Sequence, residues 1–143
     1  MTGHIARAQT EVAADRERVW EALTDPEQVA RYMMGTRVET DWSVGSPITW
    51  SGEMDGKPYQ DKGEVLRADP GWVLEVTHYS PLMGQEDRPE NYHTVRYELA
   101  SSEDGGTVVT LSQDGCSDEQ QAEQFSQSWQ GMLDELKKVV ESS

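Results

Sequence analysis

The final segment of the chain carries a helical pattern that constrains the fold more than any other feature. Apolar side chains recur there at helical spacing, at Phe125, Trp129, Met132, Leu133, Leu136 and Val140. Ser117 with Gln120 fits a capping box, and Lys137 and Lys138 fall in the last turns, where the helix dipole favours cations. The pattern predicts one helix over residues 118–140, about 35 Å long at about 1.5 Å per residue.

A long helix with one apolar face needs a surface to pack against, and the preceding residues predict strands. Gly, Pro, Asp and Ser residues form turn signals between segments of strand length. The predicted strands are Ile5–Val12, Arg37–Trp42, Ile48–Met54, Tyr59–Ala68, Trp72–Tyr79, Tyr92–Ser101 and Thr107–Gln113. Because most of the connections are short, we expect antiparallel hairpins.

Two short helices are predicted between the first two strands. Asp15 can cap a helix with one apolar stripe, formed by Val19, Trp20 and Leu23. Asp25 and Pro26 suit the start of a second helix, which ends at Gly35 and presents Val29, Tyr32 and Met33. The order of elements predicts an α+β fold. We expect one domain over residues 1–143, in which the C-terminal helix closes a curved antiparallel sheet of about seven strands.

Facing residues predict how two of the hairpins align. Placing His78 opposite His93 also pairs three sets of large side chains, Val76 with Val95, Leu74 with Tyr97 and Trp72 with Leu99. This register makes one face continuously apolar. Across the Asp55–Pro58 turn, we expect Trp50 opposite Gly63 and Ile48 opposite Val65. Asp61 falls on the same apolar face, so either the register differs there or a charge lies near the interior.

Charge and composition exclude several classes of partner. The 143-residue chain has a net charge of −15, which repels nucleic acid and anionic lipid and suits a monomer or weak homodimer. No run reaches the ~18 apolar residues that cross a membrane, and the N-terminus lacks the layout of a signal peptide. Cys116 is the one cysteine, so no internal disulfide can form, and we expect a cytoplasmic protein.

The order of elements resembles the helix-grip superfamily, also called START-like or SRPBCC. Three stretches are similar to its activator of heat-shock-protein ATPase homologue family: residues 18–27 (RVWEALTDPE), 63–66 (GEVL) and 106–111 (GTVVTL). The segment from Ser128 to Lys137 resembles the last helix of the family, and residues 78–93 resemble single-domain bacterial members. Tyr32 stands where most members carry Trp, and Ser128 where most carry Gly. The resemblance implies a cavity between sheet and helix, and its eukaryotic members are co-chaperones.

Side chains expected to face this cavity are the candidates for binding a ligand. They are Met33, Trp50, Trp72, Leu74, His78, Tyr92, His93, Tyr97, Trp129 and Met132. Rings that face a gap would stack on a flat hydrophobic ligand, whereas in a filled interior the same rings are only core. We therefore hypothesise a binder of a small hydrophobic molecule, lipid-like or aromatic and polyketide-like. The alternatives are a cyclase or hydrolase, and a co-chaperone-like interaction module.

The chain offers few catalytic groups. The predicted register brings His78 and His93 together, where either could act as a general base, or both with a carboxylate could bind a metal. The same histidines could equally form only structural hydrogen bonds at strand ends. Cys116 precedes the long helix, but Asp114 and Asp118 oppose its thiolate. Because nucleophile-elbow and phosphate-binding motifs are lacking, we expect no cofactor and no bound metal.

Overall fold

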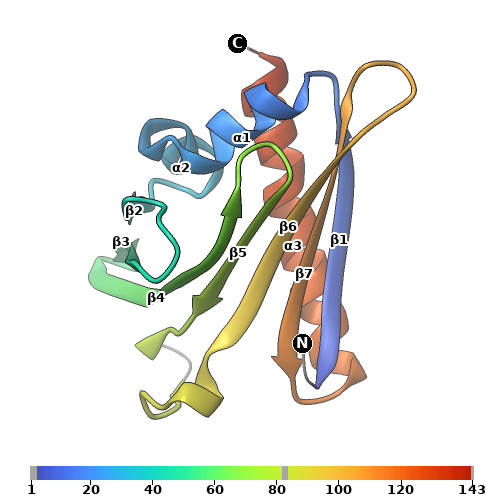
Figure 1. Cartoon of the computed structure of the whole chain (residues 1–143). Helices are drawn as coiled ribbons and strands as arrows, with labels where there is room; N and C mark the ends of the chain where they lie inside the picture. The colour runs from blue at the N-terminus through green and yellow to red at the C-terminus, as the bar shows by residue number, and fades with distance from the viewer. Residues whose placement is uncertain (1–2, 82–83, 143) are drawn as a thin grey trace.

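The structure is a computed structural model that describes residues 3–81 and 84–142, except for the side chain of Met54. The elements are β1 (His4–Val12), α1 (Arg16–Thr24), α2 (Pro26–Tyr32), β2 (Arg37–Glu39), β3 (Pro47–Met54), β4 (Lys57–Asp69), β5 (Val73–His78), the 3₁₀ turn η2 (Pro89–Asn91), β6 (His93–Ser101), β7 (Thr107–Cys116) and α3 (Glu119–Glu141). The strands form one antiparallel seven-stranded sheet in the order β1-β7-β6-β5-β4-β3-β2. α3 runs along one face of this sheet beside β1 and β7, with α1 and α2 across its C-terminal end (Figure 1). The predicted α+β fold with its closing helix is confirmed.

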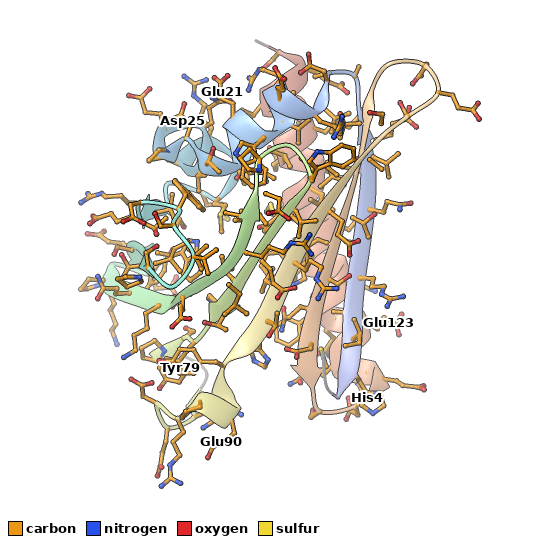
Figure 2. All side chains as sticks on the ribbon, in the orientation of Figure 1. His4, Glu21, Asp25, Tyr79, Glu90 and Glu123 are labelled. Atoms are coloured by element: carbon orange, nitrogen blue, oxygen red, sulfur yellow. The ribbon has the colours of Figure 1, made fainter. Side chains whose placement is uncertain are left out.

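Aspartates begin both short helices, as predicted. Asp15 Oδ1 accepts a hydrogen bond from the backbone N–H of Arg18 at 2.8 Å, and Asp25 Oδ1, at the start of α2 (Figure 2), accepts one from the N–H of Glu27 at 3.1 Å. α2 ends at Tyr32, before the predicted stop at Gly35, because Met34 takes a left-handed conformation with a φ of 56°. The second helix is therefore shorter than its sequence pattern indicated.

α3 begins at Glu119, one residue later than predicted, and its cap is Asp118 in place of Ser117. Asp118 Oδ1 accepts a hydrogen bond from the backbone N–H of Gln121 at 2.8 Å, and Gln121 Oε1 accepts one from the N–H of Ser117 at 2.7 Å. The predicted capping box of Ser117 with Gln120 is wrong, because the charged Asp118 carboxylate takes the cap and suits the positive end of the helix dipole. The helix itself is confirmed, and it buries Ala122, Leu133, Leu136 and Val140.

The β5–β6 register is the predicted one, with His78 opposite His93, Val76 opposite Val95 and Leu74 opposite Tyr97. The β3–β4 register differs by two residues: the observed pairs are Trp50–Asp61 and Ile48–Gly63, in place of Trp50–Gly63 and Ile48–Val65. The reason is a tight two-residue turn at Asp55 and Gly56, which both have positive φ angles. The shift places Asp61 directly across from an aromatic side chain.

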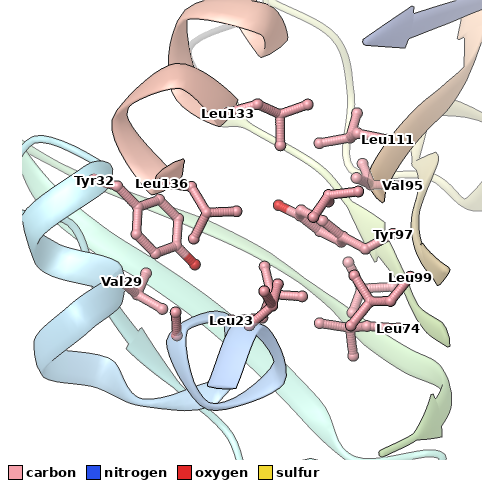
Figure 3. Packing of buried hydrophobic residues seen from close by; sticks show 14 of the residues in the cluster. Leu23, Val29, Tyr32, Leu74, Val95, Tyr97, Leu99, Leu111, Leu133 and Leu136 are labelled. Carbon is pink, nitrogen blue, oxygen red and sulfur yellow. The ribbon is translucent and has the colours of Figure 1, made fainter. Parts of the chain in front are cut away.

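The hydrophobic core lies between the sheet and the three helices (Figure 3). Leu133 and Leu136 of α3 and Leu111 of β7 are fully buried there, and Trp129 packs at the margin of the same core. Among the described residues, no helix is both long enough and apolar enough to span a membrane.

Candidate ligand-binding site

A pocket of about 90 Å³, here called the inner pocket, lies between α1, α2, strands β2 to β6 and one residue of α3. Its apolar and aromatic lining residues are Leu23, Val29, Tyr32, Met33, Val38, Trp42, Ile48, Trp50, Tyr59, Leu74, Val76, Val95, Tyr97 and Trp129. The remaining lining residues are Thr36, Asp61 and His78, which are polar. An apolar wall with a few polar groups is typical of small-molecule sites. Because a cavity of ~150 Å³ admits benzene, the pocket in this conformation is smaller than one aromatic ring requires.

Trp42 enters the pocket wall from a left-handed backbone conformation with a φ of 62°. For a bulky residue this conformation costs about 1–2 kcal/mol. Thr40 Oγ1 accepts a hydrogen bond from the N–H of Trp42 at 3.4 Å, and Asp41 Oδ1 accepts one from the N–H of Ser43 at 2.9 Å. The bond from Ser43 also lowers the pKa of the Asp41 carboxyl. The predicted strand from Arg37 is confirmed as β2, but its predicted end at Trp42 is wrong, because β2 ends at Glu39 and a turn follows it.

Asp61 and His78 form a polar pair in this apolar wall. His78 Nε2 lies 2.9 Å from Asp61 Oδ2, and the two side chains are 29% and 17% exposed. Trp50 packs edge-on against the His78 ring, with 5.1 Å between ring centroids. Because an ionised carboxylate only accepts hydrogen bonds, His78 donates from Nε2. The second carboxylate oxygen, Asp61 Oδ1, is buried and has no hydrogen-bond partner among the described residues.

Three tyrosines bring hydroxyl groups to the inner pocket. The Tyr59 hydroxyl shares a 2.7 Å hydrogen bond with the Thr36 hydroxyl. Tyr32 and Tyr97 enter the interior from opposite sides (Figure 3), and within the described residues neither hydroxyl has a hydrogen-bond partner. Burial raises the pKa of both phenols well above its ordinary value, so both are protonated at neutral pH.

A second pocket of about 70 Å³, here called the end pocket, lies on the other side of His78 and Trp129, which line both pockets. Trp129 Nε1 donates a hydrogen bond to Gln113 Oε1 at 2.6 Å, which fixes the indole between the two pockets. His93 lines the end pocket, where its Nδ1 lies 3.1 Å from the backbone oxygen of Asp114. Because a carbonyl oxygen only accepts, His93 carries a proton on Nδ1.

Most of the predicted site residues come together in the inner pocket: Met33, Trp50, Leu74, His78, Tyr97 and Trp129. The others lie elsewhere. Met132 is partly buried against the core, and His93 lines the end pocket. Tyr92 stacks on Tyr79, with ring centroids 5.1 Å apart, and its hydroxyl donates a hydrogen bond to the Asp87 carboxylate. That the six gathered residues bind a ligand stays a prediction.

Trp72 does not take its predicted place on the inner face. β5 begins at Val73, so the strand alternation does not extend to Trp72, whose side chain is 55% exposed. The guanidinium of Arg16 lies 3.5 Å from the indole centroid, a cation–π contact on the surface. The predicted alignment holds for the backbone alone, since the N–H of Leu99 donates to the Trp72 oxygen at 2.8 Å.

Sequence reasoning missed Tyr32, Trp42 and Tyr59 as site residues and left Asp61 open. Tyr59 and Asp61 are two residues apart on β4 and so share a face, a signal that alternation could have supplied. Tyr32 belongs to the apolar stripe of its helix, and that stripe alone does not show that the ring reaches the pocket. The place of Trp42 depends on a left-handed turn that no periodic pattern encodes.

Other reactive groups do not form a site. Within the described residues, no three His, Cys, Asp or Glu side chains gather where they could hold a metal ion. The two candidate histidines diverge, His78 toward Asp61 and His93 toward the Asp114 backbone. Burial, aided by Asp114 and Asp118, raises the pKa of the Cys116 thiol, which makes it a poor nucleophile.

A curved antiparallel sheet closed by one long helix, with a pocket between sheet and helices, defines the helix-grip class of proteins. The sequence pattern of the family described as "Activator of Hsp90 ATPase homolog 1-like protein" matches residues 13–141. The chain belongs to this family, which confirms the resemblance found in the sequence.

Solved structures agree with this assignment. A protein from Cytophaga hutchinsonii, ChR145, is 42% identical with a TM-score of 0.85 over 99% of this chain and 97% of its own. An AHSA1-like protein from Aeromonas hydrophila is 24% identical with a TM-score of 0.78, covering 97% and 93% of the two chains. An Aha1 dimer from Colwellia psychrerythraea is 18% identical with a TM-score of 0.73, covering 96% of each chain. No curated protein matches the chain.

Proposed function

We propose that this protein binds a small hydrophobic ligand in the inner pocket. The supporting observation is the pocket itself: about 90 Å³ of space lined mostly by apolar and aromatic side chains. Protein interiors pack to the density of organic crystals, and unfilled space larger than a water molecule is rare. Unfilled space also loses dispersion contacts along its lining, and a fitted apolar ligand restores them.

The size of the pocket limits the ligand. One ring needs the lining to move modestly, because about 90 Å³ is less than the ~150 Å³ of a cavity that admits benzene, and a lipid-like or polyketide-like molecule needs a larger movement. Met33 and Trp129 are the partly buried side chains suited to this movement, because a methionine is flexible and the indole separates the two pockets. A larger ligand would therefore extend past Trp129 into the end pocket.

Toluene is the simplest probe of this proposal. At ten times its dissociation constant it should stabilise the protein by about 1.4 kcal/mol, which for a chain of this size raises Tm by roughly 4 °C. Val76→Phe fills the pocket and should abolish the shift. Val73→Phe, on the same strand but on the other face, should preserve it. If toluene and similar rings give no shift in the unaltered protein at saturating concentration, the proposal fails.

The Asp61–His78 pair supports a second candidate function, an acid–base enzyme of the cyclase or hydrolase kind. A carboxylate that accepts from one ring nitrogen orients a histidine, as in catalytic triads, and leaves Nδ1 to exchange a proton with a substrate. Of the two predicted bases, His78 is the stronger candidate because it faces the inner pocket. His78→Gln should then abolish turnover and leave binding largely intact, whereas His93→Gln should preserve turnover. Turnover that survives His78→Gln rules this candidate out.

The acidic surface and the family's printed description support a third candidate, an interaction with a chaperone partner. A partner held by a net charge of −15 should dissociate as salt rises, because surface electrostatic attraction is screened. Pull-down with purified Hsp90 at low and high salt tests this interaction, and retention unchanged at high salt would exclude the charge-based version. Size-exclusion chromatography over a concentration series tests the monomer or weak homodimer.

A further inference from the structure

The unpartnered carboxylate oxygen of Asp61 constrains the chemistry of the ligand. Asp61 is one of the residues that line the inner pocket, and its Oδ1 is buried with no hydrogen-bond partner among the described residues. Leaving such an acceptor unsatisfied is costly, and most buried polar side-chain atoms in proteins have a partner. An unmatched acceptor on a residue that lines a pocket therefore points to a donor on the pocket's occupant, which a small shift of the lining would bring into reach.

Asp61 cannot remove this cost by turning its side chain. Its other oxygen is held by His78 Nε2 at 2.9 Å, and the His78 ring packs against the edge of Trp50. Trp50 is also the residue paired with Asp61 across β3 and β4, so the strand register fixes both ends of this arrangement. The carboxylate is thus held with one oxygen hydrogen-bonded to His78 and the other without a hydrogen bond among the described residues.

Tyr32 and Tyr97 add two further polar groups to the same pocket. Their hydroxyls also have no hydrogen-bond partner among the described residues, and both rings lie in the interior (Figure 3). A protonated phenol donates one hydrogen bond and accepts others, so each hydroxyl can bind either kind of polar atom. The remaining lining is largely apolar, and the Thr36 and Tyr59 hydroxyls and His78 Nε2 already have hydrogen-bond partners within the protein.

We propose that the ligand is a compact, ring-sized molecule whose O–H or N–H group donates a hydrogen bond to Asp61 Oδ1, with Tyr32 and Tyr97 available to its other polar atoms. This inference rests on the proposed ligand-binding function and narrows it to hydroxylated or amine-bearing rings. A purely hydrocarbon ligand offers no donor to the Asp61 oxygen.

Matched probes test the donor directly. Phenol and toluene have similar size, but toluene has no donor and is less strongly hydrated, so a purely apolar pocket prefers toluene. We expect the unaltered protein to bind phenol at least about tenfold more tightly than toluene, since the phenol O–H donates a hydrogen bond to a charged acceptor. Anisole, which keeps the oxygen but lacks the O–H, should bind like toluene or more weakly. Isothermal titration calorimetry measures all three.

Variants assign the effect to Asp61. Asp61→Leu removes the acceptor and keeps a side chain of similar size, so the preference should reverse in favour of toluene. Glu64→Leu removes an exposed carboxylate from the same strand and should preserve the preference for phenol. A preference for phenol that survives Asp61→Leu overturns the assignment to this residue.

The outcomes separate this inference from the proposed function. Toluene or anisole binding as tightly as phenol in the unaltered protein overturns the inference and leaves the hydrophobic site intact. Binding of no probe overturns both. The comparison of phenol, toluene and anisole needs no variant, so it stands even if Asp61→Leu fails to fold.

Discussion

Replacing Trp129 by Phe should destabilise the protein by about 2–4 kcal/mol. The indole Nε1 donates a 2.6 Å hydrogen bond to Gln113 Oε1, and Gln113 is only 3% exposed. Without the indole N–H, that oxygen stays buried without its donor, at a cost of about 1–3 kcal/mol. The smaller ring also leaves added space between the inner and end pockets, which costs about 1 kcal/mol more if the site does not collapse.

Urea denaturation followed by circular dichroism measures this loss. Trp20→Phe is the matched control, because Trp20 is partly buried at the core and lies outside both pockets, and it should cost about 1 kcal/mol or less. The double variant Trp129→Phe with Gln113→Met removes both hydrogen-bond partners and should be more stable than Trp129→Phe alone. If Trp129→Phe loses no more stability than the control, or if the double variant is no more stable than Trp129→Phe, the hydrogen bond between Trp129 and Gln113 does not stabilise the wall between the two pockets.

Three further predictions follow from single positions. Gly63→Ala should lower the free energy of unfolding by more than about 2 kcal/mol, because the new Cβ would lie 1.8 Å from the Thr77 backbone oxygen. Gly131→Ala, in the open middle of α3, should raise it by about 0.5–1 kcal/mol. Comparable urea midpoints for the two variants would contradict the close strand contact at Gly63. Burial raises the pKa of Tyr32 and Tyr97, so the unfolded chain releases these protons first, and stability should fall as pH rises above about 10; phenolate absorbance that shows all tyrosines ionising in the folded state would contradict this. Trp72→Leu should leave toluene affinity unchanged, because Trp72 lies on the surface beneath Arg16; a loss of affinity would return it to the site.

The elements that were predictable from the sequence are those with a repeating pattern or a local cap. The apolar spacing of Trp129, Leu133 and Leu136 defined α3, and the Asp25-Pro26 pair defined the start of α2. The β5–β6 register was predictable because alternate residues on both strands are large and apolar, so a shift by one residue would expose them. These features depend on near neighbours, which a sequence displays directly.

The site was less predictable because it depends on exceptions to those patterns. The position of Asp61 opposite Trp50 follows from a two-residue turn at Asp55, whereas the longer turn expected from the sequence gives another register. Trp42 reaches the pocket through a left-handed residue, which no alternation predicts. The prediction for Trp72 was wrong for a related reason. β5 begins after this residue, and strand alternation assigns no face to an aromatic residue in a turn.

A crystal structure determined with bromobenzene, whose bromine gives an anomalous signal, would show directly whether the inner pocket binds a hydrophobic ring. We expect a bromine peak inside the inner pocket, among Leu74, Val76 and Trp50, with the ring accommodated by a shift of Met33 or Trp129. Bromine found only on the surface at saturating bromobenzene, with the inner pocket filled by water or by its own side chains, would contradict this expectation.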